Sequence, residues 1–219
     1  EAHLDTVGVA GMTIPPFTPD IRDGRMYGRG AVDTKGSLAA MLVALEELGQ
    51  ESLPVNVMFI GACAEETGCE GVHRLELTNW PDAAIVGEPT SNRPVATHKG
   101  HLWFDIVVPG RAGHSSSPAG RDNAVARACR VVHCLLEWSE RHLTGWSNPD
   151  YERSTLAVNC IHGGSRVNAL PVSCRCSVDI RFVPGADPGC LLSELQAALA
   201  EAFAFPLTID NVRTSPGLA

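Results

Sequence analysis

The chain has 219 residues, 44% of them hydrophobic, which is enough to bury the core of one large domain or two small ones. Its net charge is -8, with acidic and basic residues interspersed, and this argues against nucleic acid as a partner. No apolar run approaches the roughly 20 residues of a membrane span and no signal peptide opens the sequence, so we expect neither membrane insertion nor secretion.

Residues 1 to about 95 alternate apolar strands with helices. Apolar side chains at three-and-four spacing predict an amphipathic helix over 34–48. The β-branched run VNVMFIGAC, over 55–63, predicts a buried parallel strand. A short helix over 71–77 and a strand over 83–87 follow. This alternation predicts a parallel sheet that is covered by helices on both faces.

From residue 100 the rhythm changes. The pattern predicts a strand, a helix, two strands, a helix and a strand over 101–108, 123–138, 155–161, 174–182, 188–203 and 207–212. This β-α-β-β-α-β order is that of the ferredoxin-like split motif. The sequence therefore predicts an α/β fold with an incomplete parallel-sheet domain at 1–97 and a ferredoxin-like domain at 98–213, after which 214–219 return towards the first.

Polar side chains gather at the predicted carboxyl ends of strands, where open α/β sheets form their sites. They are His3 and Asp5 in HLD, Asp33 in GRGAVDTKG, Glu65 and Glu66 in AEE, and Glu88 in GEPT. Taken singly they have ordinary interpretations: a packed histidine, a helix N-cap, a solvated helix start and a turn. Taken together, five converging carboxylates would repel one another unless a cation compensates, and carboxylate with imidazole suits zinc.

These motifs resemble a known family, the dinuclear zinc amidohydrolases that include acetylornithine deacetylase, succinyl-diaminopimelate desuccinylase, aminoacylase and carboxypeptidase G. HLDTV, YGRGAVDTKG, EETG and GEPT match the motifs of this family in order and spacing. The resemblance continues through THKGH and GRAGHSSSPAGRDNA to SVDIRFVPG. Within the family, GEPTSNRPVATHKGH is most similar to acetylornithine deacetylases. The resemblance implies that the ferredoxin-like domain serves as a lid and a dimerisation module.

The resemblance also implies a pair of metal ions. His3, Asp33 and Glu88 would hold one zinc, and Asp33 would bridge to a second zinc that Glu66 also binds. Cobalt or manganese are possible substitutes. The family takes a further histidine ligand from a segment beyond this chain, and we therefore expect at most one zinc in the chain alone.

Catalytic roles follow from the same resemblance. Asp5 would accept the second imidazole N–H of the metal-binding histidine and fix its tautomer. Glu65 would act as the base that moves a proton from water to the leaving amine. His114 would reach into the site of the partner subunit, whereas Asn168 and Arg181 would contact the substrate. Without the resemblance, His114 is a polar loop residue and Arg181 an edge-strand charge.

The implied activity is hydrolysis of N-acyl amino acids, with N-acetylornithine favoured, which would belong to arginine biosynthesis. A desuccinylase, aminoacylase or dipeptidase of the same family is the alternative. A non-catalytic piece that acts only through dimerisation of 98–213 is an alternative of another class. The chain opens without Met and closes without a capped element, which indicates a fragment, and its eight cysteines form no C-x-x-C pair, which is typical of reduced thiols in the cytoplasm.

Overall fold

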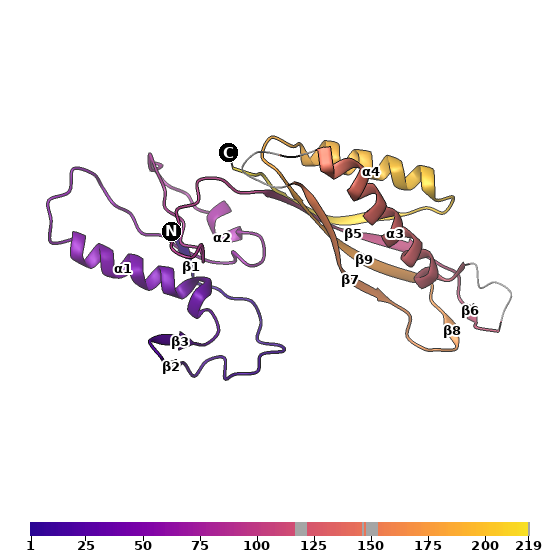
Figure 1. Ribbon diagram of the computed structural model, residues 1–219, viewed down its shortest axis with the longest axis horizontal. Coiled ribbons are helices and arrows are strands. Elements are labelled where there is room, and N and C mark those ends of the chain that lie inside the picture. Colours follow the sequence, from indigo (N-terminus) through magenta and orange to yellow (C-terminus); the bar gives the residue numbers. More distant parts are fainter. Residues whose placement is uncertain (117–121, 146, 148–152, 219) are drawn as a thin grey trace. The chain divides into compact units, whose positions relative to one another are not determined.

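The structure is a computed structural model that describes residues 1–116, 122–145, 147 and 153–218 (Figure 1). The chain divides into two compact units, Glu1–Pro94 (unit 1) and Val95–Ala219 (unit 2). Helices and strands occur in both units, so the predicted α/β class is confirmed. Within the described ranges, no helix combines the length and the apolar character that crossing a bilayer requires.

Unit 1 contains one long helix among short strands and turns. In chain order its elements are β1 (Ala2–His3), β2 (Asp20–Arg22), β3 (Arg25–Tyr27), η1 (Ala31–Lys35), α1 (Gly36–Leu48), β4 (Gly61–Ala62) and α2 (Glu70–His73). The β2–β3 hairpin turns at Asp23 and Gly24, both with positive φ, which suits the twist of a two-residue hairpin loop. Asp33 and Thr34 have non-helical backbone angles inside η1, so α1 begins two residues later than predicted.

Three segments of unit 1 lie side by side around β1. On one side, β1 pairs in parallel with β4. On the other side, the amino group of Glu1 donates to the Ile85 carbonyl at 2.8 Å, and Gly87 N–H donates to the Glu1 carbonyl at 2.8 Å. This alternation of bonds is typical of parallel neighbours. The carboxyl ends of the three segments therefore lie along one edge.

The two strands that the sequence predicted in this part are largely not formed. The run 55–63 is a strand only at Gly61–Ala62, and 83–87 is not a strand despite its bonds to Glu1. Val55 is 65% exposed and Ile85 is 78% exposed. A parallel strand needs neighbours that complete its ladder and cover both faces. In the described chain β4 pairs with β1 alone, so the strand extends only as far as that partner.

Helix α1 is apolar over most of its length, with Glu46 and Glu47 near its end, and none of its residues is buried, so the apolar face predicted for it has no core to pack against in unit 1. A helix of this kind normally lies inside a larger core. The only apolar residues buried among those described in unit 1 are Ala2 and Ala62. Unit 1 is therefore held together mainly by hydrogen bonds between its segments.

Unit 2 has the predicted β-α-β-β-α-β order. Its elements are β5 (Gly100–Pro109), β6 (Gly113–His114), α3 (Ala124–His142), η3 (Leu143–Gly145), β7 (Thr155–Gly163), β8 (Ala169–Leu170), β9 (Ser173–Phe182), α4 (Pro188–Ala202) and β10 (Thr208–Ser215). The main sheet has the strand order β10-β5-β9-β7, with every neighbouring pair antiparallel. β6 and β8 form a separate two-stranded ladder.

The large hydrophobic core lies in unit 2, where α3 and α4 cover one face of the sheet (Figure 1). Every second side chain of β5 is buried in this core: Leu102, Phe104, Ile106 and Val108. Both helices begin at a capping residue. The side chains of Asn123 and Asp187 each accept a hydrogen bond from the backbone N–H two residues further on, at 2.9 and 2.7 Å. The alternation of buried and exposed residues along β5 and the helix-capping residues together explain why the elements of unit 2 could be predicted from the sequence.

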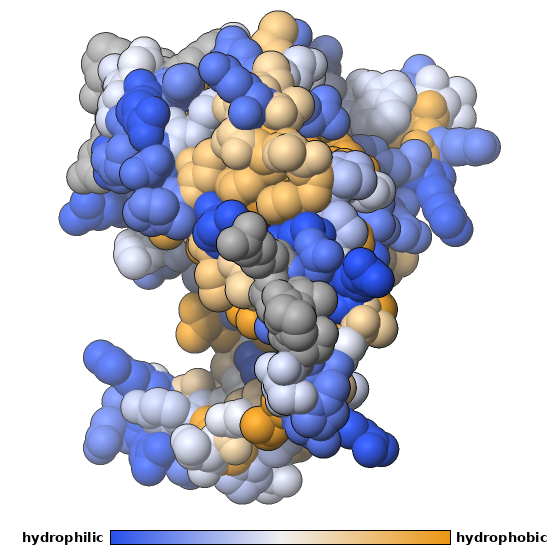
Figure 2. All heavy atoms as spheres, turned by 90° about the vertical axis from the view of Figure 1, so that its right-hand side faces the viewer, coloured by the Kyte–Doolittle hydropathy of each residue, from blue (hydrophilic) through white to orange (hydrophobic). Residues whose placement is uncertain are grey.

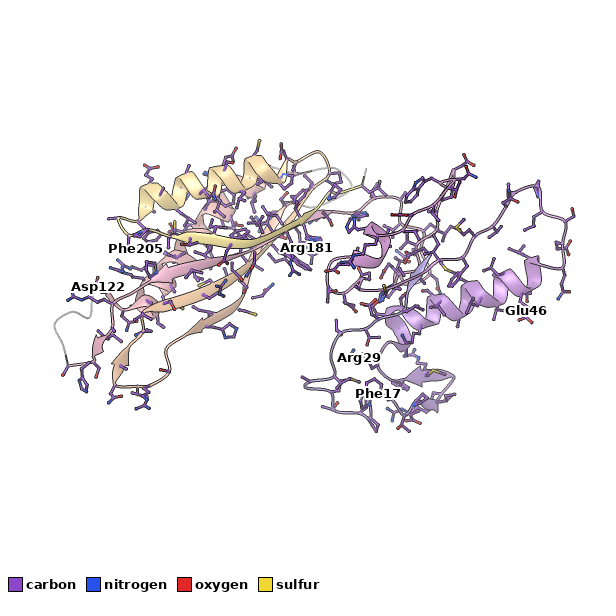
Figure 3. All side chains as sticks on the ribbon, turned by 180° about the vertical axis from the view of Figure 1, so that it is seen from behind. Phe17, Arg29, Glu46, Asp122, Arg181 and Phe205 are labelled. Carbon is purple, nitrogen blue, oxygen red and sulfur yellow. The ribbon has the colours of Figure 1, made fainter. Side chains whose placement is uncertain are left out.

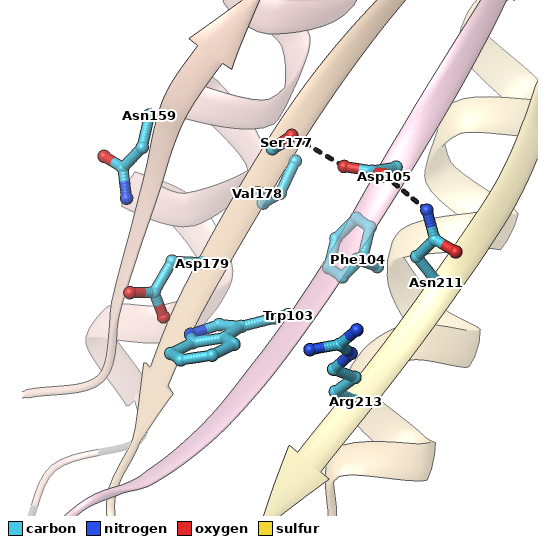
Figure 4. A pocket seen from close by; sticks show the side chains of 9 residues that line it. All are labelled: Trp103, Phe104, Asp105, Asn159, Ser177, Val178, Asp179, Asn211 and Arg213. Carbon is cyan, nitrogen blue, oxygen red and sulfur yellow. Dashed lines mark hydrogen bonds between the residues drawn. The ribbon is translucent and has the colours of Figure 1, made fainter. Parts of the chain in front are cut away.

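Polar side chains occupy the other face of the sheet. Figure 4 shows Asp105 accepting hydrogen bonds from Ser177 Oγ at 2.6 Å and from Asn211 Nδ2 at 2.7 Å. Arg175 donates to the same carboxylate at 2.8 Å and to Asp210 at 2.6 Å. Burial alone would raise the pKa of Asp105, but these donors outweigh it and the pKa is lowered. Asp105, Ser177 and Asn211 of this network line a shallow pocket of about 420 Å³.

Apolar surface gathers at one end of unit 2. Figure 2 views the molecule from this end, and Figure 3 labels Phe205 there. The groove between α4 and β10 has a volume of about 560 Å³, and its apolar lining includes Leu199, Phe203, Phe205, Leu207 and Ile209. The guanidinium of Arg127 lies over the Phe205 ring, 4.6 Å from its centroid, and so covers part of this surface.

We expect amide hydrogen exchange to separate the two units. Amides of β5 and β9 should exchange slower than those of unit 1 by roughly a hundredfold or more, because core strands open only on global unfolding. Exchange followed by mass spectrometry of peptides from the intact chain measures this. Equal protection of α1 and β9 would contradict it, and β7, at the edge of the same sheet, serves as an internal comparison.

Candidate metal centre

His3 stands at the centre of the candidate site. Its side chain is 1% exposed, and Nδ1 lies 3.0 Å from the carbonyl oxygen of Asp5. Because a carbonyl can only accept, Nδ1 carries the hydrogen and donates it. Nε2 then faces the carboxylates, 2.9 Å from Asp33 Oδ1 and 4.0 Å from Glu65 Oε2. This is the tautomer in which Nε2 can bind a proton or a metal ion.

Asp5 differs in one respect from the role predicted for it. Its backbone carbonyl, and not its carboxylate, accepts the hydrogen bond from His3; the carboxylate is 3.6 Å from Nδ1. The two carboxylate oxygens instead accept the backbone N–H groups of Glu65 and Glu66, at 3.1 and 3.2 Å. Burial would raise the pKa of Asp5, but these N–H groups lower it. Asp5 thus links β1 to the turn that carries both glutamates.

Carboxylates converge on His3 in two groups, and in each group the ligand atoms lie within 4.8 Å of one another. The first group is His3, Asp33 and Glu88, the set predicted for one zinc. The second is His3, Glu65 and Glu66, whereas Glu66 was predicted to share a metal ion with Asp33. An imidazole with several carboxylates is a donor set that fits zinc and related divalent cations.

The pKa shifts of the site residues reflect the same concentration of negative charge. Burial, followed by the charges of neighbouring carboxylates, raises the pKa of Glu65 and of Glu88. Burial alone would lower the pKa of His3, but the Asp33 hydrogen bond and the surrounding charges outweigh it, so that pKa is raised. All three shifts favour a bound proton, or another cation in its place.

Two residues that were not predicted to belong to the site connect these segments by hydrogen bonds. Thr34 Oγ donates to the Gly87 carbonyl at 2.6 Å, and Lys35 Nζ donates to the Leu4 carbonyl at 2.5 Å. Thr34 and Lys35 are the two residues after Asp33 in the motif GRGAVDTKG. Their partners lie 53 and 31 positions away in the sequence, and no local pattern could indicate them.

In unit 2 the structure brings together two of the three predicted site residues. His114 ends β6, opposite Ala169 of β8, and the N–H of Ser115 donates to the Asn168 carbonyl at 3.1 Å. His114 Nδ1 lies 2.9 Å from Ser116 Oγ, and its side chain is exposed. His114 and Asn168 therefore lie at the same end of one small ladder, the first inside it and the second directly before it.

Arg181 lies elsewhere in unit 2. It is on β9 opposite His101, at the start of β5, whereas β6 follows the end of β5 (Figures 1 and 3). Asp179 accepts two hydrogen bonds from Arg181 Nε, at 3.0 and 3.1 Å, and the guanidinium lies over the Trp103 ring. The Asp179 carboxylate and the Trp103 ring together fix the position of the guanidinium.

The family of this chain follows from comparison with known proteins. Residues 1–217 match the model of peptidase family M20/M25/M40, and the chain belongs to this family. It is similar to the solved structure of an M20 family metallo-carboxypeptidase from Sulfolobus solfataricus, with a TM-score of 0.71 and 20% identity over 95% of this chain and 62% of that one.

Two other solved structures share the fold. Human carnosine dipeptidase 1 matches with a TM-score of 0.68 and 15% identity, over 99% of this chain and 61% of that one. The aminopeptidase PepT from Bacillus cereus matches with a TM-score of 0.65 and 18% identity, over 99% and 58%. The chain thus spans about three fifths of the length of these structures.

We expect the metal-free site to weaken as pH rises. The folded-state pKa values of Glu65 and Glu88 lie above their ordinary 4.5, and that of His3 lies above 6.5. The folded form therefore binds more protons, so stability is fully present below the ordinary values and is lost as pH rises through the raised ones. The lowered pKa of Asp5 has the opposite sign, but it acts below its ordinary 3.8.

Protection factors of the Leu4 and Gly87 amides, corrected for intrinsic exchange, measure this between about pH 5 and pH 8 in chelator. They should fall with rising pH, and added zinc should restore them at the upper end because the metal replaces the protons. Amides of β9 serve as the control. A rise with pH in the metal-free chain would contradict the charge arrangement.

Proposed function

We propose that this chain carries a zinc site of a hydrolase that cleaves the amide bond of N-acyl amino acids. The observation that supports it most is the convergence of two groups of carboxylates on His3, with Asp33 and Glu65 facing its Nε2. The family supports a metal-dependent hydrolase in general, and the similar structures are those of a metallo-carboxypeptidase, a dipeptidase and an aminopeptidase. Zinc as the metal and two ions per complete subunit are part of the proposal.

The residues of the site have two roles, metal binding and proton transfer. His3, Asp33 and Glu88 would hold one ion and Glu66 a second. When bound, the metal supplies Lewis-acid activation of the amide carbonyl and of the attacking water. Glu65 takes the proton from that water and delivers it to the leaving nitrogen. Burial raises its pKa above that of a free carboxyl, which is the direction that suits a group that must first accept and then donate a proton.

The substrate is the finer part of the proposal. The favoured substrate is N-acetylornithine, on the resemblance of GEPTSNRPVATHKGH alone. Arg181 is a suitable partner for the carboxylate of an amino acid. Hydrolysis rates over N-acetyl, N-succinyl and other N-acyl amino acids and dipeptides decide between deacetylase, desuccinylase, aminoacylase and dipeptidase. Absence of metal and of turnover throughout would favour the non-catalytic alternative. The eight free cysteines support a reducing, cytoplasmic location.

Glu65→Gln should lower turnover by about 10²–10⁴-fold, the usual loss on removing a general base, and leave zinc content near that of the wild type. Glu66→Gln should instead lower zinc content, because a neutral amide is a poorer ligand than a carboxylate. Zinc content is measured on the purified chain and turnover on the longest natural form of the protein. The two variants are matched controls for each other, and equal loss of metal in both would refute the division of roles.

Dimerisation through unit 2 is also proposed, with His114 acting in the partner's site. The ten residues of β5, roughly 30 Å at strand spacing, separate the end of the sheet near Arg181 from the end that leads to His114. One small substrate could not contact both within one copy. β7 is an edge strand of nine residues that lacks Lys, Glu and Pro, the features that usually protect an edge from pairing.

Light scattering at micromolar concentration should give the mass of a dimer. Ile161→Lys places a charge on the β7 edge, where the Ile161 side chain is 49% exposed. Because an apolar contact of the interface would be replaced by a charge, the dimer dissociation constant should rise by about tenfold or more. Val212→Lys, a similar change on the opposite edge strand β10, should leave the mass unchanged. A dimer that resists the first change but not the second would show that β10, and not β7, is the interface.

A further inference from the structure

Thr34 is a polar residue with no exposed surface, an unusual position for a hydroxyl in a unit that buries so little. Its Oγ donates to the carbonyl oxygen of Gly87 at 2.6 Å. A buried carbonyl that loses its donor is left without water to replace it. This bond is therefore difficult to lose without a local change of structure.

The bond lies between two candidate ligands. Thr34 directly follows Asp33, and Gly87 directly precedes Glu88. Asp33 and Glu88 belong to one group with His3, in which the ligand atoms lie within 4.8 Å of one another. The two carboxylates repel each other, and the hydroxyl bond holds the backbones that carry them at a fixed separation.

The surroundings of Gly87 make this junction tight. A Cβ at Gly87 would come within 2.9 Å of the Ser37 side chain, 3.0 Å of the Met41 side chain and 3.4 Å of the Ala2 side chain. The start of α1 and β1 therefore both reach the backbone at this point. Gly87 N–H donates to the carbonyl that precedes Ala2, so the amide and the carbonyl of Gly87 are both bonded.

We propose that Thr34 is a positioning residue of the metal centre, whose hydroxyl sets the distance between Asp33 and Glu88. The inference rests on the proposed metal-binding function of these carboxylates. Thr34 would not touch the metal. It would act through the backbone, as do other groups that orient metal ligands from outside.

Two variants separate the hydroxyl from the packing. Thr34→Val keeps the branched shape and removes the donor, whereas Thr34→Ser keeps the donor and removes the methyl group. Zinc affinity of the intact chain, measured by calorimetric titration, should fall about 10–100-fold in the Val variant, the usual loss for groups that orient metal ligands. It should be near wild type in the Ser variant. The visible spectrum of bound Co²⁺ should change in the Val variant alone, because ligand geometry changes.

A control removes a buried hydroxyl elsewhere. Ser154 is buried in unit 2, where its Oγ accepts the N–H of Val183 at 3.1 Å. Ser154→Ala should leave zinc affinity unchanged. Three results would overturn the proposal: unchanged affinity in Thr34→Val, equal weakening in Thr34→Val and Thr34→Ser, or equal weakening in Ser154→Ala.

A second measurement needs no metal. The Lys35 amide donates to the Gly30 carbonyl at 3.0 Å, beside the Thr34 bond, and the Gly87 amide lies at its other end. In metal-free chain, Thr34→Val should speed exchange of both amides about tenfold, the scale of one lost hydrogen bond, and Thr34→Ser should not. If the wild type binds no zinc, the proposed function fails, and this exchange experiment still decides on Thr34. Unchanged exchange in Thr34→Val would then refute its positioning role.

Discussion

Repulsion among the carboxylates around His3 is the constraint on which the rest of unit 1 depends. Five acidic side chains lie at or beside one buried imidazole, and the backbone must hold them there against their own charge. It does so with bonds between segments that are remote in sequence. Asp5 holds the turn of the two glutamates, Thr34 holds the segment before Glu88, and Lys35 holds β1. Because unit 1 has almost no core, these bonds contribute much of its order.

The sequence predicted unit 2 well because its signals are local. Strict alternation along β5 and β9 marks the buried face, and the caps at Asn123 and Asp187 mark where the helices begin. Unit 1 was harder for the opposite reason. An apolar run such as 55–63 shows that a segment can be buried, but it does not show whether a neighbour is there to cover it. The strand formed only beside β1.

The candidate site was partly predictable for a similar reason. Residues that would bind metal directly are chemically distinctive, so His3, Asp33 and Glu88 could be named from type and position, and the structure places them together. The predicted acceptor of the His3 hydrogen bond was the Asp5 carboxylate, whereas the Asp5 backbone carbonyl accepts it. Residue spacing alone cannot distinguish these two acceptors of the same residue. Thr34 could not have been found at all, since its hydroxyl meets a carbonyl 53 positions away.

The location of the hydrophobic core has a consequence for biosynthesis. A ribosome makes this chain from its amino-terminal side, so the segments with the acidic side chains and the apolar helix α1 emerge before any part of unit 2. Among the described residues of unit 1, Ala2 and Ala62 are the only apolar residues that are buried. A nascent segment of this kind exposes apolar surface until the rest of the chain has been synthesised. Early-emerging segments without a core of their own are the ones that aggregate or need a chaperone. In the nascent chain, the exposed apolar side chains of α1 are therefore where a chaperone would bind while unit 2 is still being made.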